Sequence, residues 1–152
     1  MVIINDKKEV DHLIDVLNQT KKALEESNAM LLNQLSDQTI HAASIYQHTD
    51  LLSVAVIIYT LNKLVGRRDR INQKVWNSFV KKFNNEIDKA IEELRNKDAE
   101  EFMRHLDHAK ELLESGSGKA SSMYIPEIIK KASINKATKI YEHGISLSRT
   151  AH

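Results

Sequence analysis

The most apolar part of the chain is residues 51–65 (LLSVAVIIYTLNKLV), which are hydrophobic at nearly every position as far as Leu61. A helix that is apolar on all sides is buried, either in a protein core or in a membrane. A membrane span needs about 20 such residues, and this run is interrupted at Asn62 and Lys63. The pattern therefore predicts the central helix of a helical bundle that does not enter a membrane.

A first long helix is predicted to run from a cap at Asn5 or Asp6 to about Gln34. Its apolar residues recur at the three- and four-residue spacing of an amphipathic helix. Some of them also repeat every seven residues, which is typical of a coiled-coil seam. The seam consists of Val10, Leu17, Leu24 and Leu31. This repeat favours a single helix and gives one reason to expect a dimer.

A second long helix is predicted from a cap at Ser36 or Asp37 to Gly66, with a kink near Thr49, and it contains the apolar stretch. Gly66 is suited to end this helix because glycine adopts the left-handed conformation of a helix C-terminus at little cost. The residues that follow are basic, which suits the negative end of the helix macrodipole. They are Arg67, Arg68 and Arg70. We favour this structural role over the alternative, which is contact with phosphate.

Two further helices are predicted after these arginines. Asp69 is positioned to cap the third helix, whose apolar stripe is expected to dock on the central helix. The stripe consists of Trp76, Phe79, Val80, Phe83, Ile87, Ala90, Ile91 and Leu94. Asp98 is positioned to cap the fourth helix, with Glu101 at the spacing of a capping box. The inward face of the fourth helix consists of Phe102, Leu106, Ala109, Leu112 and Leu113. The predicted fold class is all-α, with a bundle of four main helices.

Residues 115–118 (SGSG) form a flexible stretch that marks a domain boundary. We expect a helical bundle at residues 1–114 and a short helical unit at residues 119–152. Four glycines and one proline among 152 residues argue against a strand-rich fold. The lack of cysteine excludes disulfides and thiolate metal sites. The N-terminus lacks the apolar core of a signal peptide, so a cytoplasmic location is expected.

Charge is distributed unevenly along the chain. The net charge is −3 over residues 1–63, zero over residues 64–118 and +4 over residues 119–152. A basic C-terminal quarter behind an acidic N-terminal half suggests contact with nucleic acid. The alternative is a solvated basic helix face without a ligand.

Histidines provide the candidate residues for metal or acid–base chemistry. His41 and His48 share one helix face, and His105 and His108 share another, with Glu101 one turn before them. Two such faces that meet in a bundle would bind a metal through imidazole and carboxylate groups. The paired Glu-x-x-His motif of di-iron bundles is absent from the sequence. We therefore expect no metal site, no cofactor and no catalytic residue.

Residues 137–152 (ATKIYEHGISLSRTAH) are the most specific feature of the sequence. The first apolar residues share one face of a short helix, which Gly144 is suited to end. Ile145 would pack back on this helix, and Ser146 would cap the next one. A helix, a glycine turn, a buried aliphatic residue and a serine cap form the opening of a helix-turn-helix.

Residues 137–151 resemble the helix-turn-helix of small prokaryotic and archaeal antitoxin-like regulators. Thr150 stands where that family usually has alanine. In that family the recognition helix follows this segment, whereas the present sequence ends at His152 before such a helix could form. The resemblance implies a regulatory lineage, and the alternative is a helical corner without a role in DNA binding. If DNA is bound, the expected phosphate contacts are Lys130, Lys131, Lys136, Lys139 and Arg149.

The sequence thus predicts a non-enzymatic, DNA-associated regulator of transcription. Its bundle would serve dimerisation or partner binding, because helix-turn-helix proteins usually act as two-fold dimers. The expected partners are duplex DNA, a second copy of the chain and, as an alternative, another protein. A second reading is a helical, antitoxin-like protein–protein interaction module without DNA binding. A third is a metal-dependent helical-bundle enzyme that uses the histidine faces.

Overall fold

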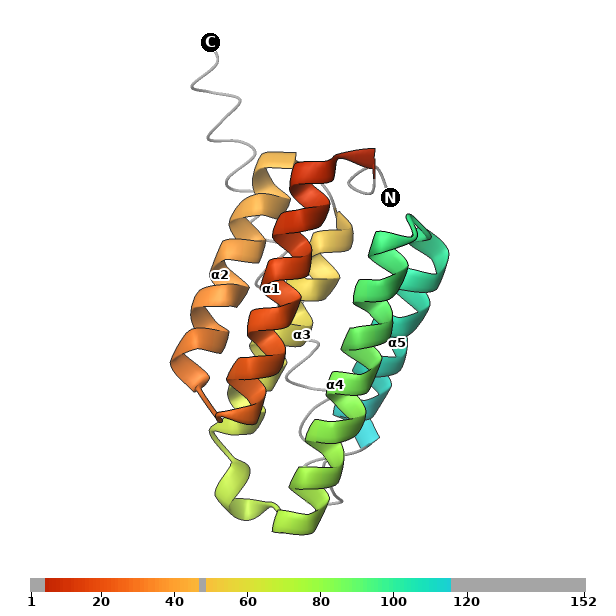
Figure 1. Ribbon diagram of the computed structural model, residues 1–152. Helices are drawn as coiled ribbons and strands as arrows, with labels where there is room; N and C mark the ends of the chain where they lie inside the picture. Colours follow the sequence, from red (N-terminus) through yellow and green to blue (C-terminus); the bar gives the residue numbers. More distant parts are fainter. Residues whose placement is uncertain (1–4, 47–48, 116–152) are drawn as a thin grey trace.

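The computed structural model describes residues 5–46 and 49–115, and all regular structure in these ranges is helical (Figure 1). Five α-helices run up and down in succession. They are α1 (Lys7–Glu25), α2 (Ala29–Tyr46), α3 (Thr49–Val65), α4 (Gln73–Arg95) and α5 (Ala99–Ser115). A short 3-10 helix, η2 (Arg68–Arg70), connects α3 to α4. The predicted all-α bundle is confirmed, with five described helices rather than four. The prediction of one kinked helix from Ser36 or Asp37 to Gly66 is wrong, because this range is divided between α2 and α3, which pack against each other.

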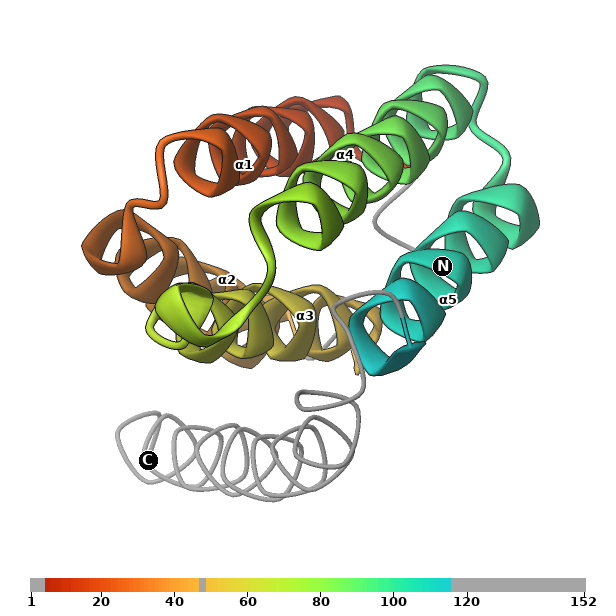
Figure 2. The ribbon, with the colours of Figure 1, turned by 90° about the horizontal axis from the view of Figure 1, so that it is seen from below.

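The five helices form a closed ring around one apolar core. Figure 2 shows α2 between α1 and α3, α5 between α3 and α4, and α4 beside α1. The most extensive contacts join the antiparallel pairs α2–α3 and α4–α5. The contact between α1 and α4 closes the ring, and α1 also touches α3.

Helix α3 contains the predicted central stretch. Residues 54–58 are all buried, and because an α-helix has 3.6 residues per turn, five consecutive residues cover every side of it. The expected burial is therefore confirmed for residues 54–58, whereas Ser53 and Lys63 of the predicted stretch are exposed. Helix α3 is one member of the ring and not its centre, so the prediction of a central helix with the others packed around it is wrong. The expectation that the stripe of α4 docks on this helix is wrong, because α4 packs mainly on α5 and α1. None of the described helices combines the length and the apolar character that a bilayer crossing requires.

The N-terminal part of the chain folds into two helices because it turns sharply after α1. Ser27 has a φ of 53°, which places it in the left-handed region. Its N–H donates to the carbonyl oxygen of Leu24 at 3.2 Å, and the N–H of Asn28 donates to that of Ala23 at 2.8 Å. This is the Schellman pattern of a helix end. The Asn28 side chain then accepts the N–H of Leu31 at 3.1 Å and begins α2.

The prediction of one helix as far as Gln34 is thus wrong, and the heptad seam is divided between α1 and α2. Leu17 and Leu24 from the seam are 2% and 0% exposed. They pack in the core of their own chain, together with the other buried residues of α1. The seam therefore provides no argument for an intermolecular coiled coil.

The turn between α4 and α5 repeats the geometry of the first turn. Lys97 has a φ of 58°. Its N–H donates to the carbonyl oxygen of Leu94 at 3.2 Å, and that of Asp98 donates to Glu93 at 2.9 Å. The Asp98 side chain accepts the N–H of Glu101 at 3.1 Å, as predicted for a cap. The reciprocal half of a capping box cannot form, because the N–H of Asp98 is already bonded to Glu93.

The hairpins α1–α2 and α4–α5 also share their register. Ser27 and Lys97, the two residues with positive φ, lie 70 positions apart (97 minus 27). Many buried residues of one hairpin have a buried partner at the same offset in the other. Such pairs are Leu13 and Phe83, Leu17 and Ile87, Leu24 and Leu94, Leu32 and Phe102, and Ala43 and Leu113. The two hairpins therefore bury many of the same positions counted from the turn, although their residues differ.

Two predicted caps are wrong, and each has a structural explanation. Ser36 lies inside α2 and is fully buried, where its hydroxyl donates to the carbonyl oxygen of Ala55 at 3.1 Å and joins α2 to α3. Asp69 lies within η2. The cap of α4 is Asn72, whose side chain accepts the N–H of Lys74 at 2.8 Å. By contrast, Asp6 caps α1 as predicted.

Helix α3 ends at Val65, next to the predicted terminator Gly66. Gly66 does not adopt the predicted left-handed conformation. Its N–H still donates to the carbonyl oxygen of Asn62 at 3.3 Å, as in a continuing helical turn. In the arginine run that follows, Arg68 donates from Nη1 to the hydroxyl of Ser27 at 2.9 Å. Arg68 therefore ties the end of α3 to the first turn, a contact that the sequence did not predict.

Candidate functional site

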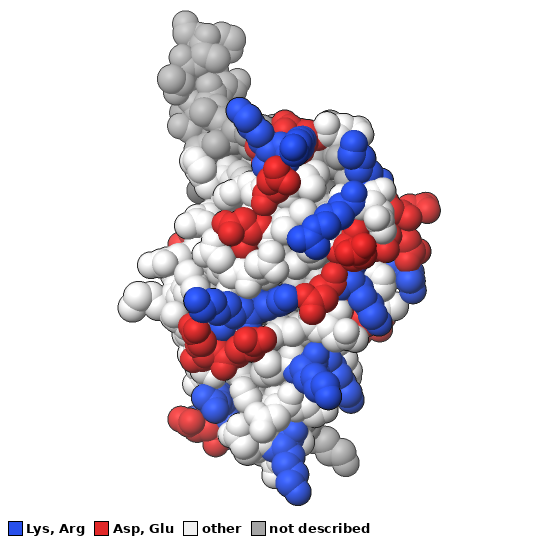
Figure 3. All heavy atoms as spheres, in the orientation of Figure 1, with Lys and Arg blue, Asp and Glu red and all other residues white. Residues whose placement is uncertain are grey.

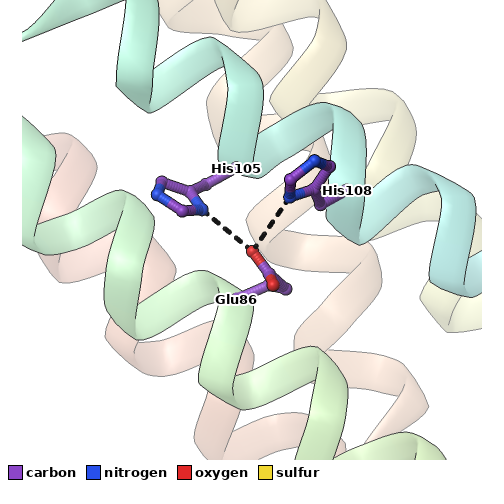
Figure 4. A group of neighbouring side chains, drawn as sticks. All are labelled: Glu86, His105 and His108. Carbon is purple, nitrogen blue, oxygen red and sulfur yellow. Dashed lines mark hydrogen bonds and ion pairs between the residues drawn. The ribbon is translucent and has the colours of Figure 1, made fainter.

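Three side chains with metal-binding donor atoms meet where α4 faces α5 (Figure 4). Glu86 comes from α4, and His105 and His108 come from α5. Nδ1 of His105 lies 2.9 Å from Oε2 of Glu86, and Nδ1 of His108 lies 3.7 Å from the same oxygen. Both imidazole rings thus point a nitrogen at one carboxylate oxygen.

The pattern of α5 places the two histidines on one face. His105 belongs to the inward stripe, between Phe102 and Ala109, and is only 9% exposed. His108 follows three residues later, at the spacing of neighbours on a helix surface. Its side chain is 41% exposed, whereas that of Glu86 is 16% exposed. The cluster therefore extends from the edge of the core to the solvent.

The Glu86 carboxylate is mostly withdrawn from water, which is unfavourable for a charge without partners. Its Oε2 lies 2.9 Å from Nδ1 of His105, and its Oε1 lies 3.8 Å from Nζ of Lys89. A carboxylate oxygen accepts hydrogen bonds, so this contact is a hydrogen bond in the His105 tautomer that carries its hydrogen on Nδ1. The rings of His105 and His108 are 5.9 Å apart at an interplanar angle of 83°.

Glu101 does not take the place that its spacing predicted. Its carboxylate accepts hydrogen bonds from Nε of Arg104 at 3.0 and 3.1 Å, on the exposed side of α5. The Arg104 hydrogen bond holds the pKa of Glu101 below its usual value, and Glu101 in turn raises the pKa of Arg104. The carboxylate that meets the histidines is Glu86, which is 19 residues before His105 in the sequence.

Sequence reasoning missed Glu86 because helical spacing relates residues within one helix only. The signal that would have found it is the turn at Lys97. Glu86 precedes Lys97 by 11 residues, and His105 follows it by 8. In an α-hairpin, positions at similar distances from the turn face each other. Without the turn's location, this pairing could not be derived.

A groove beside the cluster opens to solvent. It has a volume of ≈ 360 Å³ and includes Glu86 and His108 in its lining. The other lining residues are Lys82, Asn85, Glu111, Leu112 and Ser115. The groove gives water and small ions access to the outer side of the carboxylate and of the second imidazole.

The other predicted histidine face does not join this cluster. His41 is exposed on α2, and α3 separates α2 from α5 in the ring (Figure 2). His48 lies outside the described residues. Among the residues that the structure describes, the donors that come together are Glu86, His105 and His108.

The predicted phosphate contacts all lie outside the described ranges. They are Lys130, Lys131, Lys136, Lys139 and Arg149. The helical unit at residues 119–152 and its helix-turn-helix resemblance therefore stay predictions. No protein-family model, curated protein or solved structure matches this chain. Its function has to be inferred from its own residues.

Proposed function

We propose that this protein is a DNA-associated regulator in which the five-helix bundle provides a partner-binding or dimerisation body. The segment at residues 119–152 would contact the phosphate backbone of duplex DNA. The observation that carries this proposal is the helix-turn-helix pattern of residues 137–151 within a segment of net charge +4. Lysine and arginine that neutralise phosphates release counterions from DNA, which favours binding.

The charge of the remaining chain supports the assignment of DNA contact to this segment. Residues 1–118 contain 16 Lys and Arg against 19 Asp and Glu, a net charge of −3. On the face shown in Figure 3, basic and acidic side chains are interspersed across the described helices. A mixed surface of negative net charge offers little attraction for a polyanion. The basic residues that follow are therefore the better candidates.

The test is salt-titrated binding of the intact chain to a fluorescently labelled DNA duplex, measured by anisotropy. We expect the affinity to fall as salt rises, with a slope of about −0.9 on a log–log plot for each phosphate contact. The triple variant Lys130→Gln, Lys131→Gln and Lys136→Gln should flatten this slope by up to about 2.7, if each lysine contacts one phosphate.

A matched control removes three exposed lysines from the bundle instead, with the substitutions Lys22→Gln, Lys74→Gln and Lys81→Gln. It changes the net charge equally, so a specific role of the C-terminal lysines predicts that its slope stays close to that of the parent chain. Binding without salt dependence, or an equal loss in both triple variants, would contradict the proposal.

The protein–protein interaction module is the second candidate. It gains support if the chain shows no affinity for DNA yet is a dimer by light scattering. The heptad seam no longer motivates it, because Leu17 and Leu24 lie in the core of the same chain.

A further inference from the structure

We propose that Glu86, His105 and His108 form a binding site for one divalent transition-metal ion of the Zn²⁺ class, held between α4 and α5. This inference is independent of DNA binding, since its residues all lie in the bundle. Two imidazoles and one carboxylate are a ligand set that suits Zn²⁺ and related ions.

The geometry of the three donor atoms is close to what such an ion requires. Ligands about 2.1 Å from a tetrahedral metal are about 3.4 Å from one another. The two observed nitrogen-to-oxygen distances of 2.9 and 3.7 Å bracket this value. All three donor atoms lie within 4.8 Å of one another. Small rotations of the side chains, most easily of the half-exposed His108, would complete the site.

The other hairpin shows that packing alone does not require these polar residues. At the offset of 70, the positions of Glu86 and His105 correspond to Val16 and Leu35. Val16 is 2% exposed and Leu35 is fully buried. An apolar pair therefore satisfies the core at this place in α1–α2. Burying a carboxylate and an imidazole at this place costs free energy of desolvation that an apolar pair does not incur. Coordination of a metal ion would offset this cost.

The cluster also has an open side for a fourth ligand. Three protein ligands leave one position of a tetrahedral ion for water, and the adjacent groove at Glu86 and His108 admits it. Binding requires the neutral tautomer of His105 with its hydrogen on Nε2, so that the lone pair of Nδ1 faces the ion. Because the ligands come from two helices, the ion would also stabilise the α4–α5 hairpin.

The experiment is a calorimetric titration of the metal-free intact chain with Zn²⁺ alone, accompanied by the visible spectrum of the Co²⁺-loaded protein. We expect one ion per chain and the intense d–d bands of a tetrahedral Co²⁺ site. Glu86→Gln keeps the size of the side chain, and His108→Ala removes a half-exposed ring, so both variants should retain the fold by circular dichroism. Each should weaken Zn²⁺ binding by about tenfold or more.

The matched control is His12→Ala, which removes an exposed histidine of α1 outside the cluster. It should bind Zn²⁺ as the parent chain does. The proposal is overturned if the parent chain binds no ion, if Glu86→Gln and His108→Ala bind as tightly as the parent, or if His12→Ala loses affinity to the same extent. A Co²⁺ spectrum without tetrahedral bands in the unsubstituted chain would overturn it without reference to any variant.

Discussion

Replacing Lys97 by glycine is expected to stabilise the protein. Lys97 has a φ of 58°, in the left-handed region that an L residue with a Cβ atom adopts only at a cost of about 1–2 kcal/mol. Glycine avoids this cost but is more flexible in the unfolded chain, which opposes folding by about 0.5–1 kcal/mol. The side chain of Lys97 is exposed, so its removal leaves no cavity. The net gain in the free energy of unfolding is about 0–1.5 kcal/mol, with a central value of about 0.8 kcal/mol.

The equivalent change at the first turn should behave differently. Ser27 has a similar φ of 53°, but its hydroxyl accepts a hydrogen bond from Nη1 of Arg68 at 2.9 Å. A hydrogen bond to a charged group contributes about 1.5–3 kcal/mol. This loss exceeds the backbone gain, so Ser27→Gly should destabilise the protein. Lys97→Gly and Ser27→Gly should thus change the free energy of unfolding in opposite directions. Because the two turns have the same backbone geometry, this difference separates the backbone effect from the side-chain effect.

Urea unfolding followed by circular dichroism measures both variants. For Lys97→Gly we expect a higher midpoint at an unchanged slope, and a melting temperature about 2–4 °C higher for each kcal/mol. The control is Lys97→Ala, which removes the lysine but keeps the Cβ atom and should give no comparable gain. If Lys97→Gly lowers the midpoint, or if Lys97→Ala matches its gain, the reasoning from the backbone conformation fails.

Two other predictions concern the core and the surface of the α4–α5 hairpin. Phe83→Ala should lower the free energy of unfolding by about 3–5 kcal/mol, because Phe83 is fully buried and its ring centroid lies 5.7 Å from that of Phe79. A loss below about 1 kcal/mol, measured by urea unfolding, would contradict this packing. Glu101 has a folded-state pKa below its ordinary value of 4.5 because of Arg104, so its stabilising contribution is present above the unfolded pKa and is lost as pH falls through the folded pKa. Glu101→Gln should therefore be less stable than the parent chain at neutral pH and equally stable in acid, and a difference that persists in acid would refute the ion pair as its cause.

The sequence predicted the burial of the helices better than their ends. The stripe of α4 could be recognised because Trp76, Phe79 and Phe83 recur at helical spacing among polar residues. All three are buried, as predicted. The spacing could not reveal which helix this stripe meets, because periodicity describes one element at a time. The expected contact with α3 therefore proved wrong, while the burial itself was confirmed.

The missed turn after α1 has a clear physical origin. Positive φ was expected at Gly66, where glycine allows it, yet the structure places it at Ser27 and Lys97. Serine and lysine rarely adopt a left-handed conformation, so neither residue indicated a turn at its position. The heptad spacing of the seam therefore predicted one helix that continued through Ser27. The following caps, Asn28 and Asp98, are the better signal, and only the second was recognised.

Only part of the candidate site could be predicted from the sequence, because helical spacing relates residues within one helix. His105 and His108 share one helix, so their proximity followed from spacing alone. Glu86 belongs to the neighbouring helix, and its approach depends on the register that the turn at Lys97 imposes. Glu101 was the carboxylate that spacing offered, but its bond to Arg104 directs it along the exposed side of α5.

The ring closure between α1 and α4 sets an order of events during synthesis. The last residue of α4 is made 70 residues after the last residue of α1 (95 minus 25). At about 5–20 residues per second, a ribosome needs about 4–14 s for that interval. Until α4 is complete, α1 lacks part of its native contacts and has only α2 and α3 as neighbours. Leu17 and Leu24 are among the buried residues of α1. A nascent chain stalled before α4 should therefore bind chaperones through α1, and one stalled after α5 should release them.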